Sequence, residues 1–79
     1  MKLNKVDLNL FVAFDAIYSE SSLSGAAQLL NVTQPAMSNT LNRLRELFDD
    51  PLFVRSGRGM TPTAGAQNII GPVREALAT

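Results

Sequence analysis

The sequence predicts a mainly α-helical domain in which three helices are followed by a short β-hairpin and the beginning of a fourth helix. Apolar residues recur with helical spacing in four segments, capping residues precede these segments, and a glycine-containing turn divides an apolar stretch after the third. The 79 residues suffice for one small domain, and a hydrophobic content of 46% favours folding over disorder.

The first helix is expected from about Asp7 to Ser19, with Asp7 or Asn4 as its N-cap. One face of this helix carries the large apolar side chains that predict burial: Leu10, Phe11, Phe14, Ile17 and Tyr18. A second, shorter helix is expected over residues 23–30, because Ser22 can cap its start and Asn31 tolerates the left-handed conformation of a sharp turn.

The third helix is expected to open at the N-cap Thr33 and to run to about Phe48, with Pro35 in the first turn, where proline is tolerated. Its buried face is predicted to hold Met37, Leu41, Leu44 and Phe48. A polar face holds Gln34, Ser38, Asn39, Asn42, Arg45 and Glu46. We expect Arg45 to pair with Asp49 one turn later.

The short helix, the tight turn and the longer helix have the spacing of a helix-turn-helix: Asn31 follows the small residue Ala27 by four positions and Met37 follows it by ten. In this motif the second helix enters the major groove of double-stranded DNA. Amides on the polar face can bind adenine, while Thr33 and Ser38 can reach phosphates or base edges. A purely solvated polar face is the alternative interpretation.

After the helix-turn-helix, residues 52–55 are expected to form a strand, residues 56–59 a turn, and Met60 with Thr61 a second strand that Pro62 ends. Such a hairpin resembles a wing, in which Arg55 and Arg58 can enter a minor groove or bind a phosphate.

The fourth helix is expected to begin at the cap Thr63 and to be kinked or weakened by Gly71 and Pro72. Its apolar stripe is predicted to dimerise with a partner helix, and packing on the first helix of the same chain is the alternative. The residues of this stripe are Ala66, Ile69, Ile70, Val73 and Leu77.

Composition narrows the function. The chain has no Cys and no His, which excludes disulfides and argues against metal sites, cofactors and most nucleophile–base pairs. The only carboxylate cluster is Glu46, Asp49 and Asp50, which lacks a basic partner, so we do not expect an enzyme. Seven basic and seven acidic residues give no net charge, which counts against nucleic-acid binding and keeps a protein-interaction module as an alternative. Without a signal-peptide pattern, we expect a cytoplasmic location.

The run from Ser21 to Ala66 closely resembles the helix-turn-helix and wing of LysR-type transcriptional regulators: SSLSGAAQLLNVTQPAMSNTLNRLRELFDDPLFVRSGRGMTPTAGA. The segments VDLNLF, residues 6–11, and PLFVRSGRGMTPT, residues 51–63, look most like the nodulation-regulator (NodD-like) branch. The resemblance implies a winged helix-turn-helix over residues 1–62 and the start of a linker and dimerisation helix over residues 63–79. It also implies a missing domain that binds a small co-inducer, homodimers or larger assemblies, and operators that are short inverted repeats bounded by T and A.

Carried over by position, the resemblance implies a recognition helix over about residues 34–48 and a wing over about residues 52–61. The residues predicted to contact DNA are Ser22, Ser24, Thr33, Gln34, Pro35, Ser38, Asn39, Asn42, Arg43, Arg55 and Arg58. Arg43 is equally compatible with a plain surface position. Many family members carry a basic residue in place of Asn39 or Asn42, and Glu in place of Arg45.

Overall fold

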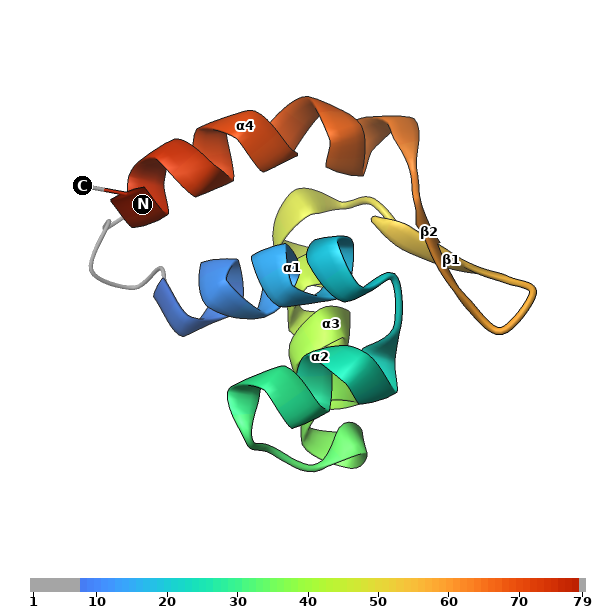
Figure 1. Ribbon diagram of the computed structural model, residues 1–79. Coiled ribbons are helices and arrows are strands. Elements are labelled where there is room, and N and C mark those ends of the chain that lie inside the picture. Colours follow the sequence, from blue (N-terminus) through green and yellow to red (C-terminus); the bar gives the residue numbers. More distant parts are fainter. Residues whose placement is uncertain (1–7, 79) are drawn as a thin grey trace.

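In the computed structural model, which describes residues 8–78, four helices and one hairpin follow in the expected order (Figure 1). The elements are α1 (Leu8–Glu20), α2 (Leu23–Leu30), α3 (Gln34–Phe48), β1 (Phe53–Ser56), β2 (Gly59–Pro62) and α4 (Ala64–Ala78). The N-caps expected for the first helix, Asn4 or Asp7, lie outside the described residues. None of the helices in the described part is long and apolar enough to cross a membrane.

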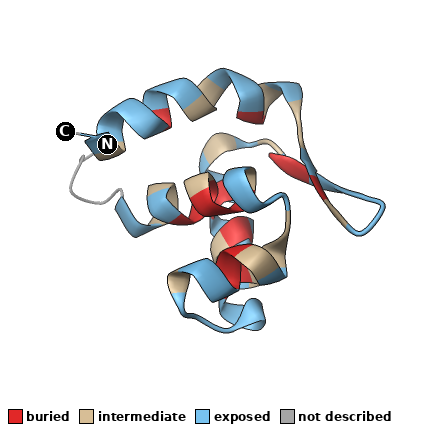
Figure 2. Cartoon of the chain, in the orientation of Figure 1, coloured by how far each residue is buried: buried red, intermediate tan, exposed pale blue. Residues whose placement is uncertain are grey.

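Helix α1 is the centre of the fold. It contacts α2 and α3 on one side and α4 on the other, while the hairpin extends away from the helices (Figure 1). The buried side chains lie where these elements meet (Figure 2). A three-helix core with a β-hairpin is the winged helix-turn-helix architecture that the sequence predicted.

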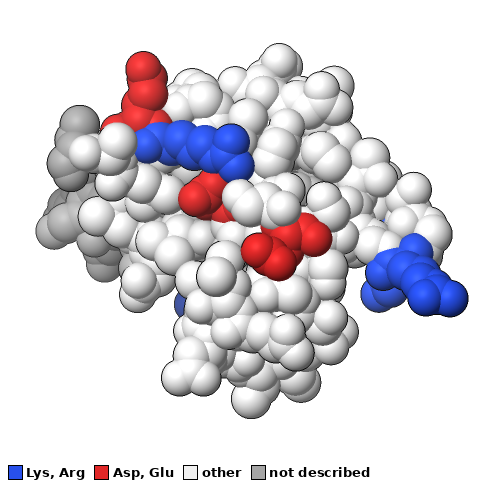
Figure 3. Space-filling model, viewed as in Figure 1, with Lys and Arg blue, Asp and Glu red and all other residues white. Residues whose placement is uncertain are grey.

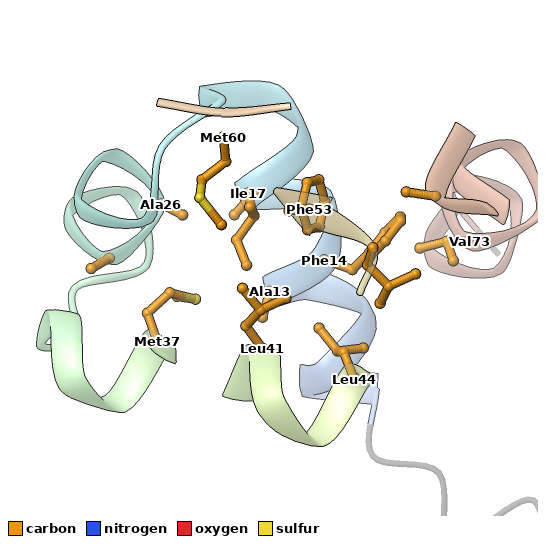
Figure 4. Packing of buried hydrophobic residues seen from close by; sticks show 14 residues of the cluster. Ala13, Phe14, Ile17, Ala26, Met37, Leu41, Leu44, Phe53, Met60 and Val73 are labelled. Atoms are coloured by element: carbon orange, nitrogen blue, oxygen red, sulfur yellow. The ribbon is translucent and has the colours of Figure 1, made fainter. Parts of the chain in front are cut away.

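The core joins every element. Phe14 and Ile17 of α1 are fully buried and face Leu41 and Leu44 of α3 (Figure 4). Phe53 brings the hairpin into this core, with its ring centroid 5.2 Å from that of Phe14. Tilted aromatic pairs at this distance add stability beyond the area they bury. The hairpin is therefore anchored at its base, which fixes where its tip stands.

Local capping explains the helix boundaries. The Ser22 hydroxyl accepts a hydrogen bond from the backbone N–H of Gly25 at 2.9 Å, and the Thr33 hydroxyl accepts one from Ala36 at 3.2 Å. Thr63 caps α4 in the same way. Asn31 adopts the left-handed conformation, with φ 58° and ψ 45°, and ends α2. These caps confirm the sequence predictions and set the tight turn between α2 and α3.

The hairpin begins one residue later than expected. Leu52 has a φ of 65° and is buried, so it turns the chain instead of joining the strand. The Asp50 carboxylate accepts a hydrogen bond from the Leu52 N–H at 2.7 Å and supports this conformation. The strands pair antiparallel from Phe53 opposite Pro62 to Ser56 opposite Gly59, which leaves a two-residue turn.

The hairpin docks on the corner between α1 and α2. The Met60 N–H donates a hydrogen bond to the Ser21 carbonyl at 2.8 Å. Gly59 lies so close to that carbonyl that a Cβ atom would collide with it. This close approach brings the hairpin beside the amino-terminal end of α2.

Helix α4 is not interrupted at Gly71 and Pro72, where we expected a kink or weakening. Both Pro72 and Asn68, whose carbonyl loses its partner at the proline, are exposed, so water can satisfy that carbonyl. Ala66 and Val73, on either side of this step, are buried against the core and hold the helix in place.

Candidate nucleic-acid interface

A polar groove lies where the amino-terminal ends of α2 and α3 meet the hairpin. Its polar lining consists of Ser22, Ser24, Gln34, Arg55 and Arg58. A second hollow shares Arg55 with the first and includes Ser38, Asn42 and Arg45 from α3. We call these two adjoining hollows the wing-side face. The structure thus brings together seven of the eleven residues predicted to contact DNA, from three elements that are separated in sequence.

The helix-turn-helix geometry explains this convergence. The Ser22 hydroxyl caps α2 and also lies 3.3 Å from the Ser24 hydroxyl, so both stand at the start of that helix. Gln34 occupies the first turn of α3, and Ser38 and Asn42 follow it at intervals of four residues along one side. The docked hairpin then places Arg55 and Arg58 across the two hollows from that row of α3 residues.

The other four predicted residues lie elsewhere. Pro35 and Asn39 are exposed on α3 and line neither hollow of the wing-side face. Thr33 is also exposed, and its hydroxyl is engaged as the α3 cap. Arg43 is exposed beside Thr40, in a separate and more apolar hollow on the other flank of α3.

Charge is unevenly distributed over the molecule. The wing-side face contains Arg45, Arg55 and Arg58 and no carboxylate. Within residues 8–78, Arg55 and Arg58 form no ion pair, so their guanidinium groups are available to an anion. Figure 3 shows the basic side chains at the hairpin end, well apart from the acidic side chains over the helices. A locally basic face therefore exists on a chain without net charge.

The expected pair between Arg45 and Asp49 is wrong. The Arg45 Nε donates to the Pro51 carbonyl at 2.8 Å, and Nη2 donates to the Phe53 carbonyl at 2.9 Å. The cause is the left-handed Asp49, with a φ of 52°, which reverses the chain so that the carbonyls after α3 return to its last turn. A basic residue in the last turn of a helix was the available signal for carbonyl binding.

Within the carboxylate cluster, Asp50 binds Thr63, the residue that caps α4. Its Oδ1 accepts hydrogen bonds from the Leu52 N–H and, at 2.8 Å, from the Thr63 hydroxyl. Thr63 in turn accepts from the Ala66 N–H at 3.1 Å. Asp50 thus connects the end of α3 to the start of α4.

The α4 stripe faces its own chain. Ala66 and Val73 are buried in the core, while Ile69, Ile70 and Leu77 are partly buried and pack against it. Packing on α1, the alternative interpretation, therefore accounts for much of this stripe. A dimerisation role for these five residues stays a prediction.

Residues 8–67 match the family model described as bacterial regulatory helix-turn-helix protein, lysR family. The chain is 51% identical to Nodulation protein D 1 of Bradyrhizobium elkanii over 77 residues, which cover 98% of this chain and 24% of that protein. It is 50% identical to the HTH-type transcriptional regulator LeuO of Escherichia coli K12, over 96% of this chain and 24% of LeuO. The resemblance thus reaches beyond the nodulation-regulator branch.

A solved structure, the CbnR_DBD–DNA complex, superposes with a TM-score of 0.86 at 25% identity, covering 92% of this chain and 84% of that one. The chain spans about a quarter of the length of the curated relatives it matches. One relative is named a nodulation protein and the other a transcriptional regulator, and neither name is that of an enzyme. The family model covers three quarters of this chain, and about half of the aligned residues are identical in each of the two relatives. The chain therefore belongs to the LysR family of bacterial regulatory helix-turn-helix proteins.

Proposed function

We propose that this domain binds double-stranded DNA sequence-specifically, as the reading head of a transcription regulator. The observation that carries the proposal is the convergence of amide and hydroxyl side chains from α3 with unpaired arginines from the hairpin on one concave face without carboxylates. The similar fold of the CbnR domain in its DNA complex supports it.

In this proposal α3 lies in the major groove, which is wide enough to admit a helix. Gln34, Ser38 and Asn42 then approach base edges, together with the exposed Pro35 and Asn39. Amides and hydroxyls both donate and accept hydrogen bonds, as base-edge recognition requires.

The hairpin supplies the charge in this arrangement. Arg55 and Arg58 reach a phosphate or an adjoining minor groove, while Ser22, Ser24 and Thr33 approach the backbone from the helix starts. Arg43 reaches the phosphates on the other flank of α3. Because only a few arginines take part, we expect a modest salt dependence.

For the longer protein we propose a homodimer on an inverted-repeat operator, in the cytoplasm where bacterial DNA lies, with a small co-inducer bound outside this segment. Dimerisation through α4 has to use the partly exposed side chains of its stripe, Ile69, Ile70 and Leu77, because Ala66 and Val73 are occupied by the core.

Fluorescence anisotropy tests the proposed function. Labelled duplexes carrying inverted repeats bounded by T and A are titrated beside scrambled duplexes over a range of salt concentrations. We expect tighter binding to a subset, weakening as salt rises. Failure of the folded protein to bind any duplex at low salt would overturn the proposal and favour the protein-interaction module.

A substitution pair sharpens this test. Gln34→Ala is expected to reduce binding to the selected duplex by about 1–3 kcal/mol while leaving the scrambled duplex almost unchanged. Gln28→Ala is the matched control, because Gln28 is exposed on α2 and lines neither hollow of the wing-side face. Equal losses on both duplexes would refute a base-reading role for Gln34.

A further inference from the structure

Within residues 8–78, Arg45 is the one arginine of the wing-side face whose guanidinium is held by hydrogen bonds from the protein's own groups. Its hydrogen bonds to the Pro51 and Phe53 carbonyls fix the group against the segment that leads into β1. The third nitrogen, Nη1, points back to α3 and donates to Oδ1 of Asn42 at 3.3 Å. The three bonds use one N–H of each guanidinium nitrogen, an arrangement that a lysine ammonium does not reproduce in this planar geometry.

The contact determines which way the Asn42 amide faces. A guanidinium has only donors, so the Asn42 carbonyl oxygen must turn toward Arg45, because the reverse orientation would set N–H against N–H. The amide nitrogen, with its two hydrogens, then points away from Arg45. Asn42 is exposed and lines the hollow of the wing-side face, so this donor is available to a ligand in it.

A fixed amide selects differently from a free one. A free asparagine pairs with adenine by donating to N7 and accepting from the N6 amino group. Arg45 occupies one lone pair of Oδ1 and holds the amide in one orientation, so the accepting half of the adenine pair has to form without tilting the amide away from Arg45. Guanine requires no acceptor from the protein, because its major-groove edge presents N7 and O6, both acceptors.

We propose that Arg45 is a positioning residue that orients the Asn42 amide as a donor, so that Asn42 selects guanine at one base pair of the operator. This inference rests on the proposed function, because it requires α3 to lie in the major groove. Arg45 itself does not touch the base in this arrangement; it acts through Asn42 and, through its two carbonyl bonds, holds the base of the wing at a fixed place beside it.

The test is a base-preference profile, obtained by selecting bound duplexes from a randomised library and counting each base at each position. The wild-type protein is expected to prefer guanine at one position by about tenfold. Asn42→Asp replaces the donor by an acceptor, and that position is expected to change to cytosine, whose N4 amino group donates. Gln28→Glu is the control with the same charge change, because Gln28 is exposed on α2 and lines neither hollow of the wing-side face.

Arg45→Met tests the positioning role directly. It frees Oδ1 of Asn42, so the preference at the same position is expected to move from guanine to adenine while other positions keep theirs. Melting of each variant is followed by circular dichroism, because Arg45→Met also removes the two carbonyl bonds. If this variant does not fold, Arg45→Glu takes its place: a carboxylate has no hydrogen to donate to Oδ1 of Asn42, so the same loss of guanine preference is expected at that position.

Three outcomes are decisive. Unchanged guanine preference in folded Arg45→Met or Arg45→Glu would overturn the positioning role. Uniform loss of binding to all sequences in Asn42→Asp would place Asn42 at a phosphate and overturn the inference as well. Wild-type binding without preference at any position would instead contradict the proposed function, so the two failures are distinguishable.

Discussion

On the face that α1 and α4 share (the α1–α4 face, with Asp15, Ser19 and Arg74), the guanidinium of Arg74 is surrounded by partners. On the wing-side face, Arg55 and Arg58 form no ion pair with any residue from 8 to 78. Arg74 lies 2.7 Å from the Asp15 carboxylate and 3.1 Å from the Ser19 hydroxyl, and 5.4 Å from the centre of the Tyr18 ring. Among residues 8–78 this is the only ion pair. The same side-chain type therefore supports the fold on one face and remains available to a ligand on the other.

The net charge of the chain is therefore a poor guide to the local charge of the wing-side face. An exposed arginine without a partner keeps its donors and its charge for a phosphate, whereas a paired one contributes little to the field around the protein. No acidic residue lines either hollow of the wing-side face, so the acidic residues balance the total charge without adding a carboxylate to that lining. Changes around α1 should therefore affect stability, and changes on the wing-side face should affect binding.

The largest effect is expected from Phe53→Ala, which removes the buried ring that joins the hairpin to α1. Loss of this side chain should lower the free energy of unfolding by about 3–5 kcal/mol, a large part of the stability of a small domain. Urea unfolding measures it, with Val54→Ala, the exposed neighbour on the same strand, as control. Equal, small effects of both substitutions would show that the ring does not anchor the hairpin.

Asp50→Ala should destabilise the domain by about 2 kcal/mol, because one carboxylate oxygen accepts from both the Leu52 N–H and the Thr63 hydroxyl. Urea unfolding again gives the value. Glu46→Ala is the control, since Glu46 is exposed and carries the same charge. A loss no larger than that of Glu46→Ala would mean that charge, and not the hydrogen bonds, accounts for the effect.

The parts of the fold that depend on neighbours in sequence were predictable. The caps Ser22, Thr33 and Thr63 act within three residues, so the helix starts they set were expected correctly. The apolar stripes gave the core, with Phe14, Ile17, Leu41 and Leu44 among its fully buried members. The motif spacing predicted that α2 and α3 form a helix-turn-helix, and the resemblance to a wing assigned the hairpin arginines to the same interface.

The parts that depend on the path of the chain between elements were not predictable. Arg45 was assigned to Asp49 by its position in the sequence, but its partners are carbonyls that the reversal after α3 returns to it. The positive φ of Leu52 arises from the same reversal. The residue type does not predict it, because a positive φ is uncommon for a bulky apolar residue. Burial of Val73 required knowledge of where α4 lies relative to α1.

Arg58→Ala should affect binding alone, because this exposed arginine has no ion pair within the described part of the chain. We expect stability to change by no more than about 0.5 kcal/mol. The slope of log affinity against log salt concentration should become shallower by about 1, on selected and scrambled duplexes alike, as loss of a phosphate contact requires. Anisotropy titrations at several salt concentrations measure the slope, and an unchanged slope would place Arg58 away from the backbone.

Arg74→Ala is the counterpart of Arg58→Ala and should have the smallest effect on DNA binding. The pair with Asp15 is half-exposed, with 49% of the Arg74 side chain accessible, so its loss and that of the Tyr18 contact should lower the free energy of unfolding by only about 0.5–1 kcal/mol. The salt slope of DNA binding should be the same as that of the wild type, because Arg74 stands on the α1–α4 face. Both variants remove one positive charge, so a contribution from overall charge would change both slopes equally. Only a local field at the wing-side face lets Arg58→Ala change the slope while Arg74→Ala leaves it intact.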